Sequence, residues 1–512
     1  MTRCSNYMRY CAMWVVCLCI SSVLQAQDYD VRLFGALADG VTDNTKTIQQ
    51  ALDSCAIHGG KVIIPKGNFV TATLFLKSNT TLYLSAGAVL LGSTDIKQYP
   101  YLNSGISFYG EEWAKQALIF CRDANNVTIE GEGTIDGRGA SFPVTTDKKP
   151  DRYRNRPYLL WFAGAKNIRV SNIHLRNSAF WMQHYLGCEN VKIDGLDIWN
   201  HSNKNNDMMD IDGCRFVTIS NIRGDSDDDG ITIKSTSPLI SQDITITNCV
   251  LSSHCNALKF GTESTGGFRN ITVSNIVIKP SSQTTTIYGK PAGNGGLAME
   301  LVDGGIMENI SISNLVIDGP QVPIFVKLGN RARKYNATAA VPPIGSIKNI
   351  KLSHILAVNA DDIGCSISGI PGKSIEDISL DDVTIQSKGM GTKADAEKKI
   401  EEMENAYPEG TMFGKLSSYG LFVRHVNGIR LSNITLKYDS TDRRPGLALV
   451  DVHRFSLNNI DIQHTKSTSA LITVEKSTDG YIGVLPFVVA KQVVTIDASS
   501  KNIINTIVPK SK

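Results

Sequence analysis

Aromatic residues, clustered basic residues and long apolar runs are all scarce in this 512-residue sequence. Phe, Trp and Tyr account for 7% of the residues, and 52 Lys and Arg nearly balance 49 Asp and Glu, for a formal net charge of +3. Because no segment is strongly basic, nucleic acid is not an expected partner. Beyond residue 26 no apolar run is long enough to cross a bilayer, so we expect no membrane span in the mature chain.

The first 26 residues have the features of a secretory signal peptide. Arg3 and Arg9 precede a short apolar segment at 12–24, and Ala26 places a small residue at the cleavage site. The apolar segment is short for a bilayer span. We therefore predict a signal peptide over 1–26, cleavage near Ala26 and a secreted or periplasmic protein. A retained membrane anchor is the alternative.

Cysteine spacing gives no sign of a metal site. Four of the eleven cysteines fall within the first 26 residues, and the other seven are scattered from Cys55 to Cys365 without a CxxC pair or a Cys/His metal spacing. We expect most of these seven to be buried as small apolar residues. Zinc is not expected.

A short phrase, roughly Asn-Ile-x-Ile, recurs along most of the chain. It occurs at 126–129, 167–170 and 190–193, and further copies follow at intervals of 26 to 51 residues as far as Arg454. Each copy alternates apolar β-branched and polar residues, the pattern of a half-buried strand. No helices separate the strands, and no hairpin turns recur as they do in a β-sandwich. The pattern predicts an all-β fold: a single-stranded, right-handed parallel β-helix.

The sequence also predicts how the solenoid is capped at its N-terminal end and where it carries an insertion. Ile48, Ala51, Leu52 and Cys55 form a helical stripe behind capping residues, which predicts an N-terminal capping helix within a cap at about 30–60. Residues 27–512 are expected to form one β-helix domain. A long interval between repeats predicts an insertion at about 388–420, with helical propensity at 393–407.

Aspartates concentrate between residues 205 and 234. Asp207 and Asp228 are 21 residues apart, nearly one coil, so Asp207, Asp228 and Asp229 are expected to cluster on adjacent strands. Close carboxylates raise one another's pKa, which leaves one protonated beside an ionised partner. Glycoside hydrolysis needs that acid and base. On spacing alone, a calcium site or turn-capping aspartates fit equally well.

The same segment resembles glycoside hydrolase family 28, the polygalacturonase group of pectin-degrading enzymes. Residues 205–210 resemble the motif Asn-Thr-Asp-Gly-x-Asp, and 227–229 resemble Gly-Asp-Asp with Asp227 in place of glycine. Residues 34–44, 156–157, 177–181 and 230–235 add to the resemblance. It implies that Asp228 is the general acid, that Asp207 and Asp229 are bases activating water, and that the anomeric configuration is inverted. It implies no metal and no organic cofactor.

The family's Gly-His-Gly segment can be placed in two ways. One alignment puts His254 at the histidine position, whereas alignment on Gly261 puts Asn256 there. His254 is therefore a catalytic candidate, with an ordinary turn histidine as the alternative. In the Gly261 alignment Lys259 faces outward beside the aspartates, as a partner for a substrate carboxylate or as a solvated lysine.

One departure from the resemblance bears on the substrate. Where the family has Gly-Ile-Arg-Ile-Lys, whose two cations bind a galacturonate carboxylate, this chain has Ala298 and Glu300. A neutral sugar such as rhamnose beside the cleaved bond, or a carboxylate bound by Lys259, Lys327, Arg331 or Arg333, would reconcile the two. The candidate substrate-binding residues are Trp181, His184, Asn205, Asn256, Lys259, Glu300 and Arg331. Residues 407–414 and 424–425 are candidates for the cleft wall.

Three functions remain open at this point. The first is an inverting glycosidase, expected to be a monomer, that acts on acidic plant cell-wall polysaccharides or oligosaccharides of galacturonan or rhamnogalacturonan type. The second is a uronate polysaccharide lyase on the same fold, which needs calcium and an Arg or Lys base. The third is a non-catalytic carbohydrate-binding β-helix. Fold alone does not choose among them.

Overall fold

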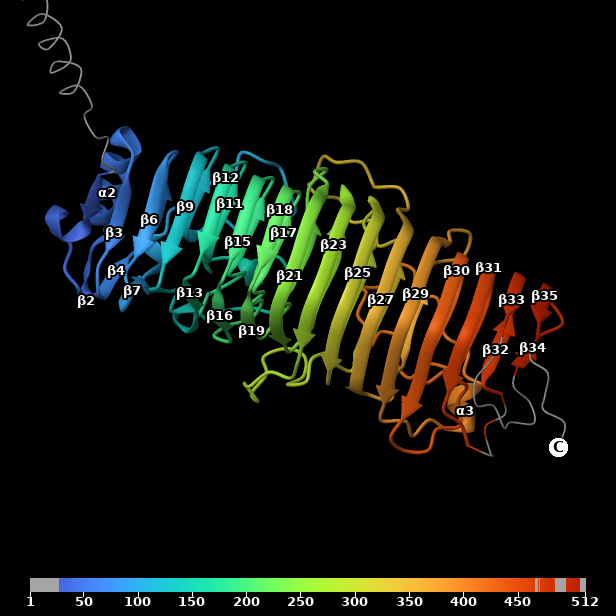
Figure 1. The fold of residues 1–512 in the computed structure, drawn as a ribbon. Coiled ribbons are helices and arrows are strands. Elements are labelled where there is room, and N and C mark those ends of the chain that lie inside the picture. Colours follow the sequence, from blue (N-terminus) through green and yellow to red (C-terminus); the bar gives the residue numbers. More distant parts are fainter. Residues whose placement is uncertain (1–26, 466–467, 469, 484–493, 507–512) are drawn as a thin grey trace, which may run out of the picture.

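The chain winds into a long stack of parallel coils (Figure 1). The computed structural model describes residues 27–465, 468, 470–483 and 494–506, so the predicted signal peptide lies outside the described residues. The 35 described strands join into one continuous sheet, and every pairing between named strands is parallel, as in β12 (Lys166–Ser171) against β15 (Glu189–Asp194). The predicted parallel β-helix is confirmed.

The strands form three faces of the solenoid. The first face is the longest and contains β1 (Asp28–Asp30), β3 (Lys61–Ile64), β6 (Thr80–Leu84), β9 (Asn125–Gly131), β12, β15, β18 (Arg215–Ser220), β21 (Ser241–Ser253), β23 (Gly267–Ile278), β25 (Ile306–Asp318), β27 (Ser346–Ala360), β29 (Ile375–Ser387), β30 (Leu421–Tyr438), β31 (Leu447–Ile462), β33 (Thr478–Ile482) and β35 (Lys501–Asn505). The second face contains β2 (Asp39–Asp43), β4 (Gly67–Thr71), β7 (Ala88–Gly92), β10 (Thr134–Asp136), β13 (His174–Arg176), β16 (Asp197–Asn200) and β19 (Arg223–Ser226), and it continues in the second half of β21.

The third face positions the site discussed below. Its strands are β5 (Leu74–Leu76), β8 (Ala117–Arg122), β11 (Tyr158–Ala163), β14 (Gln183–Leu186), β17 (Met209–Asp212), β20 (Ile231–Ser235), β22 (Asn256–Ser264), β24 (Gly295–Leu301), β26 (Val322–Leu328) and β28 (Cys365–Ser368), followed by the first parts of β30 and β31 and by β32 (Ile472–Glu475) and β34 (Val494–Ile496). These strands hydrogen-bond in register from coil to coil, so residues one coil apart become neighbours.

The residue that opens each repeat, most often asparagine, makes the turn into the first face. Asn126, Asn167 and Asn190 have φ angles of 59°, 54° and 55°, in the left-handed region that Asn tolerates better than most residues. Their side chains stack, because Asn167 donates to the Asn126 amide oxygen at 3.1 Å and Asn190 donates to that of Asn167 at 3.0 Å. The aliphatic residues that follow are aligned between coils, as Ile168 is with Val191, and form the buried core.

The N-terminal cap is the helix α2 (Thr45–His58), which buries Ile48, Ala51, Leu52 and Cys55. These are the four residues of the predicted stripe, so the capping helix is confirmed. The other helices in the described part of the chain are short: η1 (Val31–Phe34), η2 (Ile96–Gln98), η3 (Gly139–Ser141), η4 (Asp151–Tyr153) and α3 (Lys393–Ala396).

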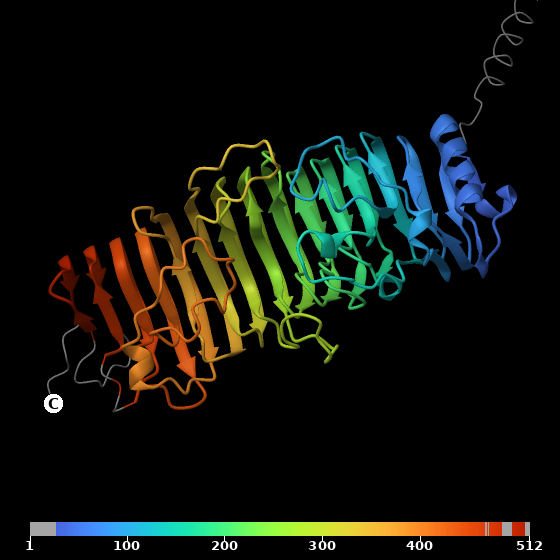
Figure 2. The same ribbon diagram turned by 180° about the vertical axis from the view of Figure 1, so that it is seen from behind.

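The segment at 388–420 lies between β29 and β30 and is almost entirely irregular. Only α3 is helical within it, where Thr392 and Asp395 form a capping box. The prediction of helical structure at 393–407 is therefore wrong beyond α3. Ile400 and Phe413 pack against the third face instead of forming part of a helix. Long loops, including those in cyan, yellow and orange, lie over the face seen in Figure 2.

All seven cysteines among the described residues are buried and free, in agreement with the prediction that they serve as small apolar core residues. Within the same part of the chain, no helix is long and apolar enough to cross a membrane.

Candidate active site

Three aspartates meet where strands β17 and β20 of the third face begin. Met209 pairs with Ile231, and the Met208 amide donates to the Asp229 carbonyl at 2.9 Å. This register places Asp207 directly beside Asp229, with Asp228 one residue earlier. The predicted cluster is confirmed, but the neighbour of Asp207 across the coil is Asp229 rather than Asp228.

Asp207 is 2% exposed and contacts a buried lysine. Lys234 Nζ donates to Asp207 Oδ2 at 3.2 Å and lies 3.2 Å from Asp210 Oδ1. The Oδ1 atom of Asp207 is buried and has no hydrogen-bond partner among the described residues. Burial raises the pKa of Asp207 well above its ordinary value; Lys234 opposes this shift, whereas the charges of Asp228 and Asp229 add to it.

Asp228 is the most exposed of the three aspartates, and its pKa is raised into the neutral range. Burial and the adjacent Asp229 charge raise the pKa of Asp228 to about 7. Its Oδ1 accepts the Asp229 amide at 3.0 Å, and Asn205 Nδ2 donates to its Oδ2 at 3.5 Å. Asn205 is itself held by Arg156, which donates to its side-chain oxygen at 3.1 Å.

Three donors converge on Asp229. Lys259 Nζ donates to Oδ2 at 2.9 Å, and the Asn256 amide and side chain donate to Oδ1 at 3.2 and 2.8 Å. Hydrogen bonds and a nearby cation both favour the ionised form of a carboxyl group. Lys259 thus faces outward beside the aspartates, while Leu258 and Phe260 are buried in the core, as the Gly261 alignment predicts.

A cleft of about 320 Å³ opens over these carboxylates. It is lined by charged and polar side chains together with aromatic rings, from strands and from loops that are distant in sequence: Tyr109, Trp113, Lys149, Arg152, Tyr153, Trp181, Asn205, Asp207, Asp228, Asp229, Lys234, Cys255, Lys259, Thr262, Glu263, Tyr288, Gly289, Asn294, Arg333, Tyr407 and Glu409. Aromatic rings beside convergent polar groups suit a sugar ligand. Of the predicted residues, the cleft brings together the three aspartates, Trp181, Asn205 and Lys259.

Trp181 and the insertion supply opposite parts of this lining. Lys234 Nζ lies 4.0 Å from the Trp181 ring centroid, so that ring covers the lysine that binds Asp207. Tyr407 and Glu409 bring the predicted insertion into the cleft wall. Arg424 does not reach the cleft, because it is buried and donates to the Ile400 carbonyl at 2.8 Å.

His184 was a candidate for sugar binding, and the structure corrects this. Its side chain is fully buried, its Nε2 lies 3.0 Å from Asp212 Oδ2, and its ring packs on Trp161 and Tyr158 beneath the cleft. Trp181 precedes β14 and His184 lies within it. The sequence alone does not show that Tyr158 and Trp161 of the neighbouring strand pack against the His184 ring.

Glu300 was a candidate for substrate binding, but the structure buries it away from the cleft. It is 0% exposed, and neither carboxyl oxygen has a hydrogen-bond partner among the described residues, although Oε2 lies 3.7 Å from Lys259 Nζ. Burial raises the pKa of Glu300 to about 8, with Lys259 opposing the shift and Glu409 adding to it. A carboxyl group buried in this way does not bind sugar hydroxyls from the cleft.

Arg331 and Lys327 likewise fall outside the cleft lining. Arg331 Nε donates to Asp303 Oδ1 at 2.9 Å, and its Nη2 donates to Thr262 Oγ1 at 3.1 Å. Lys327 is 1% exposed and donates to the Glu402 carbonyl at 3.3 Å. Both cations are paired with protein groups, and neither lines the cleft, so substrate binding by Arg331 stays a prediction. Its neighbour Arg333 lines the cleft instead.

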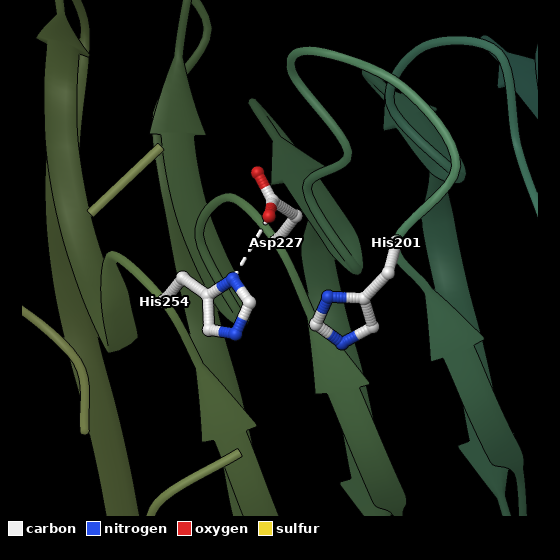
Figure 3. A group of neighbouring side chains, drawn as sticks. All are labelled: His201, Asp227 and His254. Atoms are coloured by element: carbon white, nitrogen blue, oxygen red, sulfur yellow. Dashed lines mark hydrogen bonds and ion pairs between the residues drawn. The ribbon is translucent and has the colours of Figure 1, made fainter. Parts of the chain in front are cut away.

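His254 lies behind the aspartates, outside the cleft lining. Its Nδ1 is 2.8 Å from Asp227 Oδ1 and its Nε2 is 2.8 Å from the Gln283 carbonyl oxygen. Asp227 also accepts the Ile287 amide at 2.8 Å and the Tyr288 amide at 3.0 Å. We call Asp227 and His254 (Figure 3) the loop clasp, because their hydrogen bonds hold residues 283–288. His254 contacts this loop and Asp227 in the structure, whereas Asn256 contacts the catalytic candidate Asp229.

The loop clasp is also where the ligand types for a metal ion come closest. The ligating atoms of His201, Asp227 and His254 lie within 4.8 Å of one another (Figure 3). Both nitrogens of His254 already face acceptors, and the Asp227 carboxylate already has three donors. These contacts are complete as hydrogen bonds, and the group fits a clasp better than a coordination site. At the aspartates, Lys234 and Lys259 already supply the positive charge that calcium would bring.

Sequence reasoning missed most of the cleft's loop residues, including Lys149, Arg152, Tyr288 and Asn294. They stand in irregular segments without a repeat, so no spacing relates them to the aspartates. For Lys234 and Glu263 the sequence indicated only that they belong to strands, not that they line the cleft. Their pairing at 3.7 Å depends on the coil register.

Comparisons with known proteins agree with this geometry. The sequence profile described as glycosyl hydrolases family 28 matches residues 56–407. The chain is 27% identical over 376 residues to a probable polygalacturonase of Vitis vinifera, covering 69% of this chain and 73% of that protein. It is 24% identical to an exo-poly-alpha-D-galacturonosidase of Dickeya chrysanthemi, covering 56% of each.

A solved structure shares the fold. An exopolygalacturonase from Thermotoga maritima superposes with a TM-score of 0.60 at 21% identity, covering 70% of this chain and 87% of that one. The matched profile extends over most of the β-helix and includes all three cleft aspartates. The parallel β-helix has three aspartates at one cleft, and the family profile matches more than half of the chain. The protein therefore belongs to glycosyl hydrolases family 28 and is a glycoside hydrolase.

Proposed function

We propose that this protein hydrolyses glycosidic bonds in pectic, galacturonate-containing polysaccharides or oligosaccharides, with inversion of anomeric configuration. The observation that carries the proposal is the contrast within the aspartate cluster. Asp228 has a pKa of about 7, whereas Asp229 receives three donors from Asn256 and Lys259. One carboxyl group is suited to give a proton and its neighbour to take one. The names of the relatives support the pectic substrate.

In the proposed step Asp228 donates its proton to the glycosidic oxygen as the bond from that oxygen to the anomeric carbon breaks. Asp229 removes a proton from a water molecule whose oxygen attacks the anomeric carbon from the opposite side. Asp207 assists by holding that water through its unpartnered Oδ1. Each catalytic group returns to its starting state by proton exchange with solvent. Attack opposite to the leaving group inverts the configuration.

The lyase alternative is weaker on this geometry. A lyase needs a neutral amine or guanidine to take the proton beside the uronate carboxyl group. Burial disfavours the charged form of Lys259, but Asp229 and Tyr407 outweigh it and raise the lysine pKa well above its ordinary value. Lys259 is therefore a poor base, and an ammonium at 2.9 Å from Asp229 also displaces calcium from that carboxylate.

The substitution Asp228→Asn tests the proposal. We expect kcat on polygalacturonic acid to fall by about 10²- to 10⁴-fold, the usual contribution of a general acid, with thermal stability maintained. The matched control is Asp123→Asn, which changes an exposed aspartate with a φ of 51° that Asn also tolerates. Equal activity of the two variants would contradict the assignment of Asp228.

A further inference from the structure

Most of the cations in and around the cleft are already paired with protein carboxylates. Lys234 contacts Asp207, Lys259 contacts Asp229 at 2.9 Å, and Arg331 donates to Asp303. Arg333 hydrogen-bonds to Glu263. Because their charge is balanced, these residues have little left to attract an acidic sugar.

Lys149 and Arg152 line the same cleft and differ in this respect. Among the described residues, neither forms an ion pair. Their side chains contact aromatic residues, and Arg152 also forms a hydrogen bond with the Tyr153 side chain. Lys149 Nζ lies 5.7 Å from the Tyr407 ring centroid, and the Arg152 guanidinium lies 5.9 Å from that of Tyr288. The Nε atom of Arg152 is buried without a hydrogen-bond partner.

The carboxylate of Glu263 also lines the cleft, but it is paired with other cations. Glu263 accepts a hydrogen bond from Arg333 and lies 3.7 Å from Lys234 Nζ. Burial raises its pKa, but these cations outweigh burial and hold the pKa of Glu263 well below its ordinary value. Two unpaired like charges therefore remain three residues apart on one loop. Burial and the charge of Arg152 lower the pKa of Lys149, and the charge of Glu263 opposes this shift without reversing it. An anion placed between them would relieve this repulsion.

The two positions at which the family resemblance places cations are buried and inaccessible from the cleft in this chain. Ala298 and Glu300 are both 0% exposed, and Ala298 packs against Phe325, Phe413 and Phe422. No substrate carboxylate reaches these two residues. If the substrate carries a carboxylate, other cations must bind it. Among the described cleft residues, Lys149 and Arg152 are the cations without a carboxylate partner.

We propose that Lys149 and Arg152 form a carboxylate-binding subsite for a uronate residue of the substrate. The guanidinium offers paired donors that match a carboxylate, and the ammonium adds a compact charge. Tyr288 and Tyr407 flank the two cations with surfaces for the sugar ring. This inference rests on the proposed function, since it names the chemical group that the same cleft recognises.

Binding of trigalacturonate and of its methyl ester, measured by calorimetry in an Asp228→Asn background, tests the subsite without turnover. We expect Lys149→Met and Arg152→Gln each to weaken binding of the acid about tenfold, and the double variant by more. Binding of the ester should change little. Lys148→Met and Arg154→Gln are the matched controls, because both residues are exposed on the same loop and outside the cleft lining.

Equal losses for acid and ester would show that the loop was merely disturbed, and no loss for either would show that the cations do not bind the carboxylate. Both results overturn the inference. A second measurement covers variants that fold poorly: affinity of the unsubstituted cleft for the acid should fall with salt, and affinity for the ester should not. If the enzyme with Asp228 intact binds the acid selectively but cleaves no pectic polymer, the subsite stands and the proposed function fails.

Discussion

Asp228 differs from its two neighbours in lacking a cation. Asp207 and Asp229 each contact a lysine, whereas the hydrogen bonds to Asp228 come from Asn205 and from the Asp229 amide. Burial and the Asp229 charge raise the pKa of Asp228 to about 7, although the charges of these two lysines oppose the shift. Burial also raises the pKa of Asp207, so Asp228 is distinguished by its exposure and its free access to a proton donor or acceptor in the cleft rather than by burial alone.

A specific pH dependence follows from this difference. Asp228 must be protonated to act as an acid, and its pKa is about 7 rather than 3.8. We therefore expect kcat/KM to fall as the pH rises through about 7, and an acidic limb to appear where the base becomes protonated. Initial rates on a soluble galacturonate oligomer between pH 4 and pH 9 measure both limbs. Activity that stays flat up to pH 9 would contradict the assigned acid.

The residue assignments from sequence succeeded where the repeat fixed the register. Asp207, Asp228 and Asp229 lie together because they precede adjacent strands, and Lys259 faces them because strand residues alternate. The choice between His254 and Asn256 needed the structure, since it depends on a two-residue offset within one turn. The predictions that His184 and Glu300 bind substrate do not fit the structure. A single sequence does not distinguish a residue buried beneath a cleft from one exposed within it.

At the scale of elements, the loop clasp links a departure from the family motif to a cleft wall. Asp227 stands where the resemblance has glycine, and its carboxylate accepts the amides of Ile287 and Tyr288. His254 adds a contact to the Gln283 carbonyl. The clasp therefore holds in place the loop that brings Tyr288 to the cleft.

The substitution Asp227→Asn should loosen this loop. Both nitrogens of His254 face acceptors, so its doubly protonated form fits the site, and removing the Asp227 charge leaves a buried imidazolium unpaired. Breaking a buried ion pair of this kind costs about 3–5 kcal/mol. We expect a lower Tm and faster hydrogen exchange at the amides of Ile287 and Tyr288. Exchange at both amides unchanged from the unsubstituted protein would refute the clasp.

Elements with a repeat were predictable, and those without one were not. The strands and α2 follow directly from alternation and from a helical stripe. Residues 397–407 favour a helix by composition. The segment instead packs against the third face, where Ile400 joins an apolar cluster with Phe413. Tertiary packing outweighs local propensity in such a segment.

At the scale of the whole molecule, the solenoid supplies a rigid row of strand ends and the loops supply the walls. Tyr109, Lys149, Tyr288, Arg333 and Tyr407 come from five separate segments and meet over one set of coils. The parallel β-helix could be inferred from the repeat alone. The convergence of these loops could not, because each loop runs without a periodic signal across the face seen in Figure 2.

The most direct test of the account is proton NMR of the first sugar released from alpha-linked polygalacturonic acid, recorded before mutarotation. The account predicts a new reducing end that appears first as the β-anomer, with no unsaturated product. Initial release of the α-anomer would contradict inversion by Asp228 and Asp229, and a vinyl proton signal would show that the cleft eliminates rather than hydrolyses.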